Sequence, residues 1–170
     1  SEKQFAKYCI SGFTIAENSV IILLYRLFFV KIPMNAMRPC HLQISTRADG
    51  EEESLFSAEA EMELAPQSAL LRYRQGEGVV LLRIREGEVS LEREGDYRLR
   101  LSFSEGRALP GILGIASAEG RVETFTRRVG CSIGKNSVLL ALRYTLRLEG
   151  GDREMRIRLS ARNKGEPEEK

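Results

Sequence analysis

The stretch VVLLRIREGEVSLEREGDYRLRLSF, residues 79–103, alternates apolar and polar side chains in three short runs. Glu86-Gly87 separates the first two runs, and residues 94–96 separate the second from the third. A period of two, interrupted only by short glycine-containing turns, predicts consecutive antiparallel strands. The rest of the fold has to accommodate this meander.

The turns can be tested by pairing side chains across them. A two-residue loop at Glu86-Gly87 sets Ile84 opposite Val89, and a three-residue loop at residues 94–96 sets Leu91 opposite Leu99. The apolar faces then coincide in both hairpins. Because a slip of one residue would turn a whole strand inside out, this agreement is stronger evidence than strand propensity alone.

Alternation of this kind covers most of the chain after residue 40. Further strands are predicted at residues 42–46, 56–64, 69–74 and 124–133, and a Gly150-Gly151 loop sets Tyr144 opposite Ile157 in the last hairpin. Residues 108–114 contain Pro110 and two glycines, which predicts a rim loop or bulge, and mixed parity predicts a bulge near Gly130. We therefore expect an all-β, up-and-down meander of nine or ten strands that closes into a barrel.

The chain divides into three parts by composition. We expect an N-terminal extension at residues 1–36, a barrel domain at residues 37–162 and a disordered polar tail at residues 163–170. The extension contains the apolar run VIILLYRLFFV, residues 20–30, which is shorter than the roughly 20 residues a spanning helix needs. It could pack on the barrel as a helix or strand, associate with a membrane, or not belong to the natural protein; membrane association is the least favoured.

Charge and cysteine content exclude several classes. The 170 residues carry 26 basic and 24 acidic side chains, a balance that does not predict nucleic-acid binding. Three cysteines, Cys9, Cys40 and Cys131, and the single histidine His41 do not form a metal-ligand pattern, so no metal site is expected. The odd cysteine count favours a reducing, cytoplasmic setting.

No catalytic motif is present. The sequence lacks a nucleophile elbow, a P-loop, a dinucleotide-binding glycine pattern and a zinc-protease motif. We therefore predict no catalytic residues and no cofactor, and a non-enzymatic role is favoured.

Arg93 is the most informative polar residue. The alternation that directs Val89 and Leu91 inward also directs Arg93 inward, opposite Tyr97 if the loop at residues 94–96 has three residues. An unpaired buried charge costs several kcal/mol, so Arg93 must find a partner. It could plug the barrel mouth by stacking on Tyr97 or Tyr73, or it could anchor an anionic ligand; the plug is favoured.

Two functional hypotheses follow. In the first, the barrel binds a small amphipathic or anionic ligand, and the predicted lining residues are Arg93, Tyr97, Tyr73, Phe103, Tyr144, Thr124, Thr126 and Arg128. In the second, these side chains fill the barrel, and a basic outer face binds an acidic protein, RNA or an identical subunit as a homodimer. That face would comprise Arg98, Arg100, Arg143, Arg147, Arg156 and Arg158, unless Glu59, Glu61 and Glu63 neutralise part of it.

Several short motifs resemble a known family. They are Ile44-Ser45 with residues 49–52 (DGEE), residues 89–95 (VSLEREG), residues 101–103 (LSF) and residues 142–146 (LRYTL). Together they resemble the YwiB-like family, domain of unknown function 1934. The resemblance implies a calycin-like, lipocalin-type β-barrel in a bacterial cytoplasmic protein, and it implies no activity. Residues 1–36 have no counterpart in the pattern, and residues 109–121 depart from it.

Overall fold

The computed structural model describes residues 37–165, and every strand in that range pairs with its neighbours in an antiparallel manner. The strands are β1 Arg38–Ala48, β2 Ser54–Ala65, β3 Ser68–Gln75, β4 Gly78–Arg85, β5 Glu88–Glu94, β6 Tyr97–Ser104, β7 Ala108–Ile115, β8 Ala118–Ile133, β9 Ser137–Leu148 and β10 Gly151–Asn163. Consecutive strands are hydrogen-bonded throughout, and β1 pairs with β10 to close the barrel. The predicted all-β, up-and-down barrel is confirmed, with no helix between residues 37 and 165. The interpretations of residues 1–36 lie outside the described residues.

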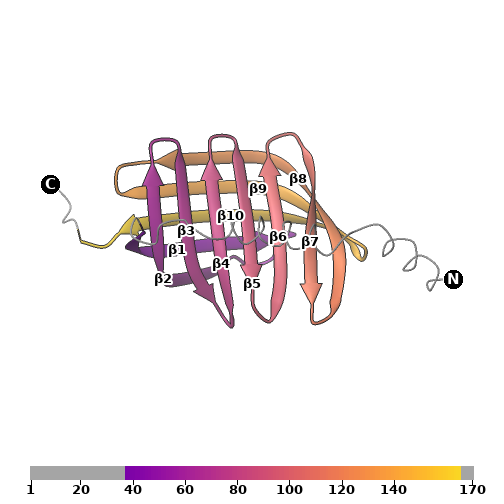
Figure 1. The fold of residues 1–170 in the computed structure, drawn as a ribbon. Coiled ribbons are helices and arrows are strands. Elements are labelled where there is room, and N and C mark those ends of the chain that lie inside the picture. Colours follow the sequence, from indigo (N-terminus) through magenta and orange to yellow (C-terminus); the bar gives the residue numbers. More distant parts are fainter. Residues whose placement is uncertain (1–36, 166–170) are drawn as a thin grey trace, which may run out of the picture. The chain divides into compact units, whose positions relative to one another are not determined.

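The barrel is flattened into two layers. Figure 1 shows β3 to β7 side by side, with β1, β9 and β10 running across them behind, while β2 and β8 bend from one layer into the other. Sheets packed in this way meet through their inward side chains, while the alternate residues face outward. Two faces of the second layer are therefore distinct: an inner face toward the core, and an outer face made by β2, β1, β10, β9 and β8 in that order.

The core lies between the layers. Phe103, Leu42, Met62, Leu71 and Ile84 are among the largest fully buried side chains. Each such side chain stabilises the fold by about 1.5–3 kcal/mol through its removal from water. Their alternation along the strands is the pattern that predicted the barrel.

The predicted register at Glu86-Gly87 is confirmed, because Ile84 pairs with Val89. The β3–β4 hairpin has the same kind of apolar pairing, with Tyr73 opposite Val80. Gly87 has φ +74°, a value that glycine adopts without a steric penalty.

The predicted β5–β6 register is wrong by two residues. Leu91 pairs with Leu101 rather than Leu99, so the connection is longer than three residues. A Cβ on Gly95 would lie 2.5 Å from the Cα of Gly78, which shows how tightly this corner folds against the β3–β4 turn. A shift of two residues keeps every side chain on the same face, so the apolar pattern could not detect it.

The predicted register of the β9–β10 hairpin is also wrong by two residues. Leu148 pairs with Gly151, so the loop is Glu149-Gly150 and not Gly150-Gly151. Tyr144 consequently pairs with Met155 rather than Ile157. The strand β10 extends through Asn163, and the backbone N–H of Lys164 donates to the carbonyl of Pro39.

Residues 108–115 form a regular strand, contrary to the predicted rim loop. The β6–β7 ladder ends where Arg100 pairs with Ile112, so Pro110 lies where β7 has no ladder partner on its β6 side. Pro110 therefore interrupts no hydrogen bond between β6 and β7, because no β6 carbonyl is paired with this position. A Cβ on Gly111 would lie 2.7 Å from the Arg100 carbonyl oxygen, which accounts for glycine at that position.

The bulge in β8 lies between Thr126 and Arg128, not at Gly130. Before it, Thr124 pairs with Leu146; after it, Val129 pairs with Leu142. The extra residue reverses the parity of the strand, as the mixed sequence pattern indicated. It thereby turns Arg128 to the outer face, opposite Arg143.

Candidate functional site: a closed interior and a basic outer face

Arg93 lies at the end of the barrel with only 5% of its side chain exposed. Its Nη1 donates to the carbonyl of Tyr97 at 2.9 Å, and its Nη2 donates to the carbonyl of Gln75 at 3.2 Å and to Oδ1 of Asp96 at 2.6 Å. The hydrogen bond from Arg93 is the main cause of the lowered pKa of Asp96. The positive charge of Arg93 is therefore balanced by Asp96 and by the carbonyls of Gln75 and Tyr97.

The guanidinium of Arg93 is also held between two surfaces. Its Cζ lies 3.6 Å from the centroid of the Tyr97 ring, a cation–π contact. On the other side it covers Gly78, where a Cβ would lie 2.5 Å from Cζ. Of its nitrogens, Nε is buried and has no hydrogen-bond partner among the described residues. This arrangement is the plug predicted from the sequence.

The aromatic residues predicted to line a ligand cavity pack on one another. The rings of Phe103 and Tyr144 meet edge to face at 4.7 Å between centroids, and those of Phe56 and Tyr73 lie 5.9 Å apart. Burial is the main cause of a rise in the pKa of Tyr73 and of Tyr144, each to about 12. Tyr73, Phe103 and Tyr144 are therefore part of the buried core.

The two inward threonines have different surroundings. Thr124 Oγ1 donates to the carbonyl of Ser102 at 2.6 Å, close to where the β6–β7 ladder has ended. Thr126 Oγ1 is buried and has no partner among the described residues. Of the eight predicted site residues, Arg128 alone is fully exposed, on the outer face. The others belong to the inner side of the barrel or its plugged end.

The outer face of the second layer carries a row of arginines. Arg47 pairs with Arg156, Arg156 with Arg143, and Arg143 with Arg128, on the adjacent strands β1, β10, β9 and β8. We call these four residues the arginine row. With neighbouring strands about 4.8 Å apart, the row spans about 14 Å. Like charges placed directly opposite one another destabilise a sheet, so the row has an energetic cost.

Most of the row is not neutralised. Arg47 donates to the backbone carbonyls of Gly50 and Glu51. Within residues 37–165, no carboxylate lies within 4.0 Å of the side-chain nitrogens of Arg128, Arg143, Arg156 or the nearby Arg158. Glu154 on β10 forms an ion pair with Arg127 at 2.6 Å. A hollow of about 390 Å³ opens beside Arg47, Arg143 and Arg156, and Asp49 and Glu154 also line it.

The other arginines predicted for the basic face are paired. Arg98 lies 3.4 Å from Glu119 and Arg100 lies 3.5 Å from Glu94, both on the opposite layer, while Arg147 lies 2.5 Å from Glu123. Two of the three predicted acids of β2 are engaged elsewhere: Glu61 pairs with Arg72, and Glu59 with Lys164 and His41. The Lys164 hydrogen bond is the main cause of the lowered pKa of Glu59. Of the six arginines predicted for the basic face, those without an acidic partner among the described residues are therefore Arg143, Arg156 and Arg158, on β9 and β10.

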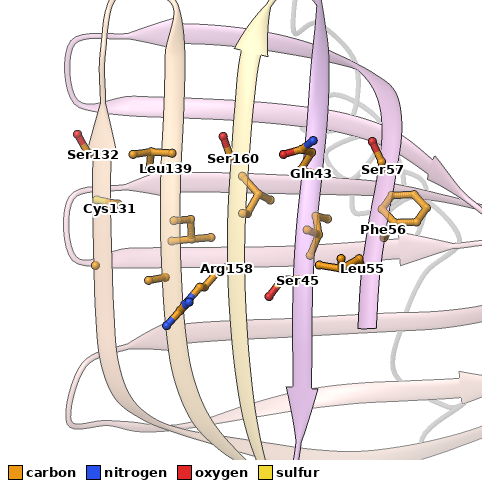
Figure 2. A pocket seen from close by; sticks show the side chains of 15 residues that line it. Gln43, Ser45, Leu55, Phe56, Ser57, Cys131, Ser132, Leu139, Arg158 and Ser160 are labelled. Atoms are coloured by element: carbon orange, nitrogen blue, oxygen red, sulfur yellow. The ribbon is translucent and has the colours of Figure 1, made fainter. Parts of the chain in front are cut away.

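An apolar groove adjoins the arginine row on the same outer face. Its volume is about 770 Å³, and its described lining comes from residues 43–45, 55–57, 130–132, 139–141 and 158–160. Figure 2 shows Ser132, Leu139, Ser160, Gln43 and Ser57 as one row across five neighbouring strands. The next row contains Gly130, Ala141, Arg158, Ser45 and Leu55, and the arginine row follows it.

Sequence reasoning missed this groove. Leu55 is 83% exposed and Leu139 is 50% exposed, each beside an inward apolar neighbour. The available signal was an apolar side chain at an outward position of an alternating strand. Ile115, which is 60% exposed on the opposite layer, shows that this signal alone does not locate a groove.

Neither a metal-ligand cluster nor a membrane-spanning helix is present among the described residues. Between residues 37 and 165, no three metal-ligating side chains of His, Cys, Asp or Glu type converge on a common point. In the same part of the chain, no helix has the length and apolar character that crossing a membrane requires.

Comparison with known proteins gives a family and a fold. The family described as domain of unknown function, DUF1934, matches residues 41–159. The crystal structure of the ywiB protein from Bacillus subtilis is similar with a TM-score of 0.69 and 16% sequence identity, covering 79% of this chain and 100% of that one. No curated protein matches the chain. The resemblance inferred from the short motifs is confirmed: the chain belongs to the DUF1934 family and has its β-barrel fold.

Proposed function

We propose that this barrel is a binding protein whose functional surface is its outer arginine face, and that it takes an anionic partner there. The observation that carries the proposal is the arginine row, in which Arg128, Arg143 and Arg156 have no carboxylate partner within residues 37–165. Three adjacent uncompensated guanidinium groups repel one another. A bound anion removes that repulsion and gains charge-assisted hydrogen bonds.

The interior supports this assignment by contrast. Arg93, the residue best placed to anchor an anion inside the barrel, already has Asp96 and two carbonyl acceptors. The rings of Phe103 and Tyr144 are buried in the core and pack edge to face on one another. A ligand inside the barrel would have to displace these contacts, whereas Arg128, Arg143 and Arg156 have no carboxylate partner within residues 37–165 that an anion would displace.

Tripolyphosphate is a suitable probe, because its charges are closely spaced along a short chain. We expect it to bind the full chain with an affinity that falls as salt is added. The double substitution Arg143→Gln and Arg156→Gln removes two charge-assisted contacts of about 1.5–3 kcal/mol each, so affinity should fall at least tenfold.

The matched control is Arg98→Gln with Arg100→Gln, which removes the same charge from arginines that already have acidic partners. This control should bind tripolyphosphate within about twofold of the unmodified chain, since exposed ion pairs contribute little. Equal loss of affinity in both double variants would reduce the effect to net charge and contradict the proposal.

A further inference from the structure

The groove offers an apolar surface and the adjoining arginine row a cationic one, so together they complement a ligand that has an apolar part and an anionic part. Arg158 lies in the groove and is separated from Arg156, in the arginine row, by a single residue of β10. Alternate residues of a strand lie about 6.7 Å apart, so cationic and apolar surfaces meet within the length of a few bonds. A ligand with an anionic head and an apolar tail could contact both at once.

The groove has the size and surface that an acyl chain requires. At about 770 Å³ it falls within the range of small-molecule sites, about 300–1,000 Å³. Leu55 and Leu139 expose apolar surface to it, while Ala141 and Gly130 between them are small and let a chain approach the sheet closely. Covering exposed leucine surface is favourable in proportion to the area removed from water.

Charge decides which head group fits. Arg158 is the one charged side chain among the described lining residues, and no carboxylate within residues 37–165 pairs with it. The Ser45 hydroxyl beside it already donates to Glu53. An anionic head group would compensate Arg158 and extend toward Arg156, whereas a cationic head group would be repelled.

We propose that the groove binds the acyl chain of a single-chain anionic amphiphile, such as a fatty acid, with its head group held by Arg158 at the edge of the arginine row. The proposal deepens the function proposed above and rests on it, since it names the class of anion that the outer face takes. It places the ligand outside the barrel, on the sheet opposite to β3–β7.

The test uses the full chain, with dodecanoate below its critical micelle concentration, in a calorimetric titration. We expect saturable binding that weakens by up to about fourfold, or ~0.8 kcal/mol, for each methylene removed from the chain. Dodecyltrimethylammonium has the same tail and the opposite charge, and should show no saturable binding. Equal affinity for the two amphiphiles would overturn the assigned head-group contact.

Two substitutions locate the site, and each has a control of the same type. Arg158→Gln should weaken dodecanoate binding at least tenfold, and Leu139→Gln at least threefold. Arg98→Gln and Ile115→Gln, on the opposite layer, should leave it unchanged. Dodecanoate binding that is insensitive to both groove variants would place the ligand elsewhere, for example in the barrel or on residues 1–36, and would overturn the inference.

Two independent readouts complete the test. Cys131 lines the groove and is exposed, so bound dodecanoate should slow its alkylation by iodoacetamide. If Leu139→Gln instead converts a dimer to a monomer in solution, the groove is an interface between copies of the chain and the inference fails. Tripolyphosphate binding that depends on Arg143 and Arg156, without any dodecanoate binding, would leave the proposed function standing and remove only this extension.

Discussion

The guanidinium Cζ of Arg93 lies over the ring of Tyr97, 3.6 Å from its centroid, and Nη1 donates to the carbonyl of the same residue. Two of the three nitrogens of this buried guanidinium thus donate to acceptors in the adjoining turns, while Nε has no partner among the described residues. This relationship bears on the two functional hypotheses, because the guanidinium of Arg93 already donates to three acceptors within the fold.

Gly78 is essential to that corner. Gly78→Ala places a Cβ 2.5 Å from the Arg93 Cζ, so the guanidinium must leave its partners. We expect a loss of about 1–3 kcal/mol in the free energy of unfolding, measured by urea denaturation. Gly150→Ala is the control, since nothing lies within 4 Å of its Cβ position, and should change stability by less than about 0.5 kcal/mol.

The cause of the Gly78 effect can be isolated with a double-mutant cycle. In an Arg93→Leu background the clash is reduced, so Gly78→Ala should cost less than in the unmodified chain. Identical costs in the two backgrounds would mean that Gly78 is required for a reason other than Arg93.

Thr124 and Thr126 form a natural pair for a second prediction. Thr124→Val removes the hydroxyl that donates to the Ser102 carbonyl and should lower the free energy of unfolding by about 1 kcal/mol. Thr126→Val replaces a buried hydroxyl that has no partner among the described residues, so stability should be unchanged or higher. Thermal denaturation of the two variants gives the comparison, and a larger loss for Thr126→Val would contradict the assignment of the Thr124 hydrogen bond.

Stability should fall in alkali. Folding raises the pKa of Tyr73 and Tyr144 to about 12, so the protonated phenols favour the folded state. Their contribution is fully present below the unfolded value near 10 and is lost as the pH rises toward 12. Each tyrosine accounts for about 2–3 kcal/mol.

Tyr144→Phe tests this assignment, because it keeps the ring and removes the ionisation. The variant should match the unmodified chain at pH 7 and lose less stability between pH 10 and pH 12. Parallel curves for the two proteins across that range would show that Tyr144 does not contribute to the alkaline transition.

The cysteines should differ in reactivity. Burial, with Glu59 and Glu61 nearby, raises the pKa of Cys40 to about 11, and its side chain is fully buried. Cys131 is exposed. At pH 8 iodoacetamide should therefore modify Cys131 in the folded chain and reach Cys40 only after unfolding, as peptide mapping would show. Modification of both at equal rates would mean that the barrel opens easily around β1.

Sequence reasoning recovered the barrel but not every register. Where a turn is short, as at Glu86-Gly87, the pairing of Ile84 with Val89 follows from the pattern. At residues 94–96 and at Gly150-Gly151 the pattern allowed a two-residue shift, because such a shift keeps each face intact. Only the space around Arg93 and the actual loop lengths decide between these registers.

The candidate site was predictable in part. Outward positions for Arg143 and Arg156 follow from alternation, but their alignment with Arg47 and Arg128 depends on barrel closure and on the β8 bulge. Which arginines have acidic partners depends on which strands are neighbours. The sequence therefore indicated a basic face without showing that Arg98 and Arg100 lie on the other layer with partners of their own.

The central claim is that ligands bind outside this barrel and not inside it. Chemical-shift mapping of the arginine Nε–H signals during a tripolyphosphate titration of the full chain tests it directly. The account predicts shifts at Arg143, Arg156 and Arg128, with the Arg93 signal unchanged. Shifts at Arg93 together with Tyr97, and none along the arginine row, would place the site at the barrel mouth and contradict the account.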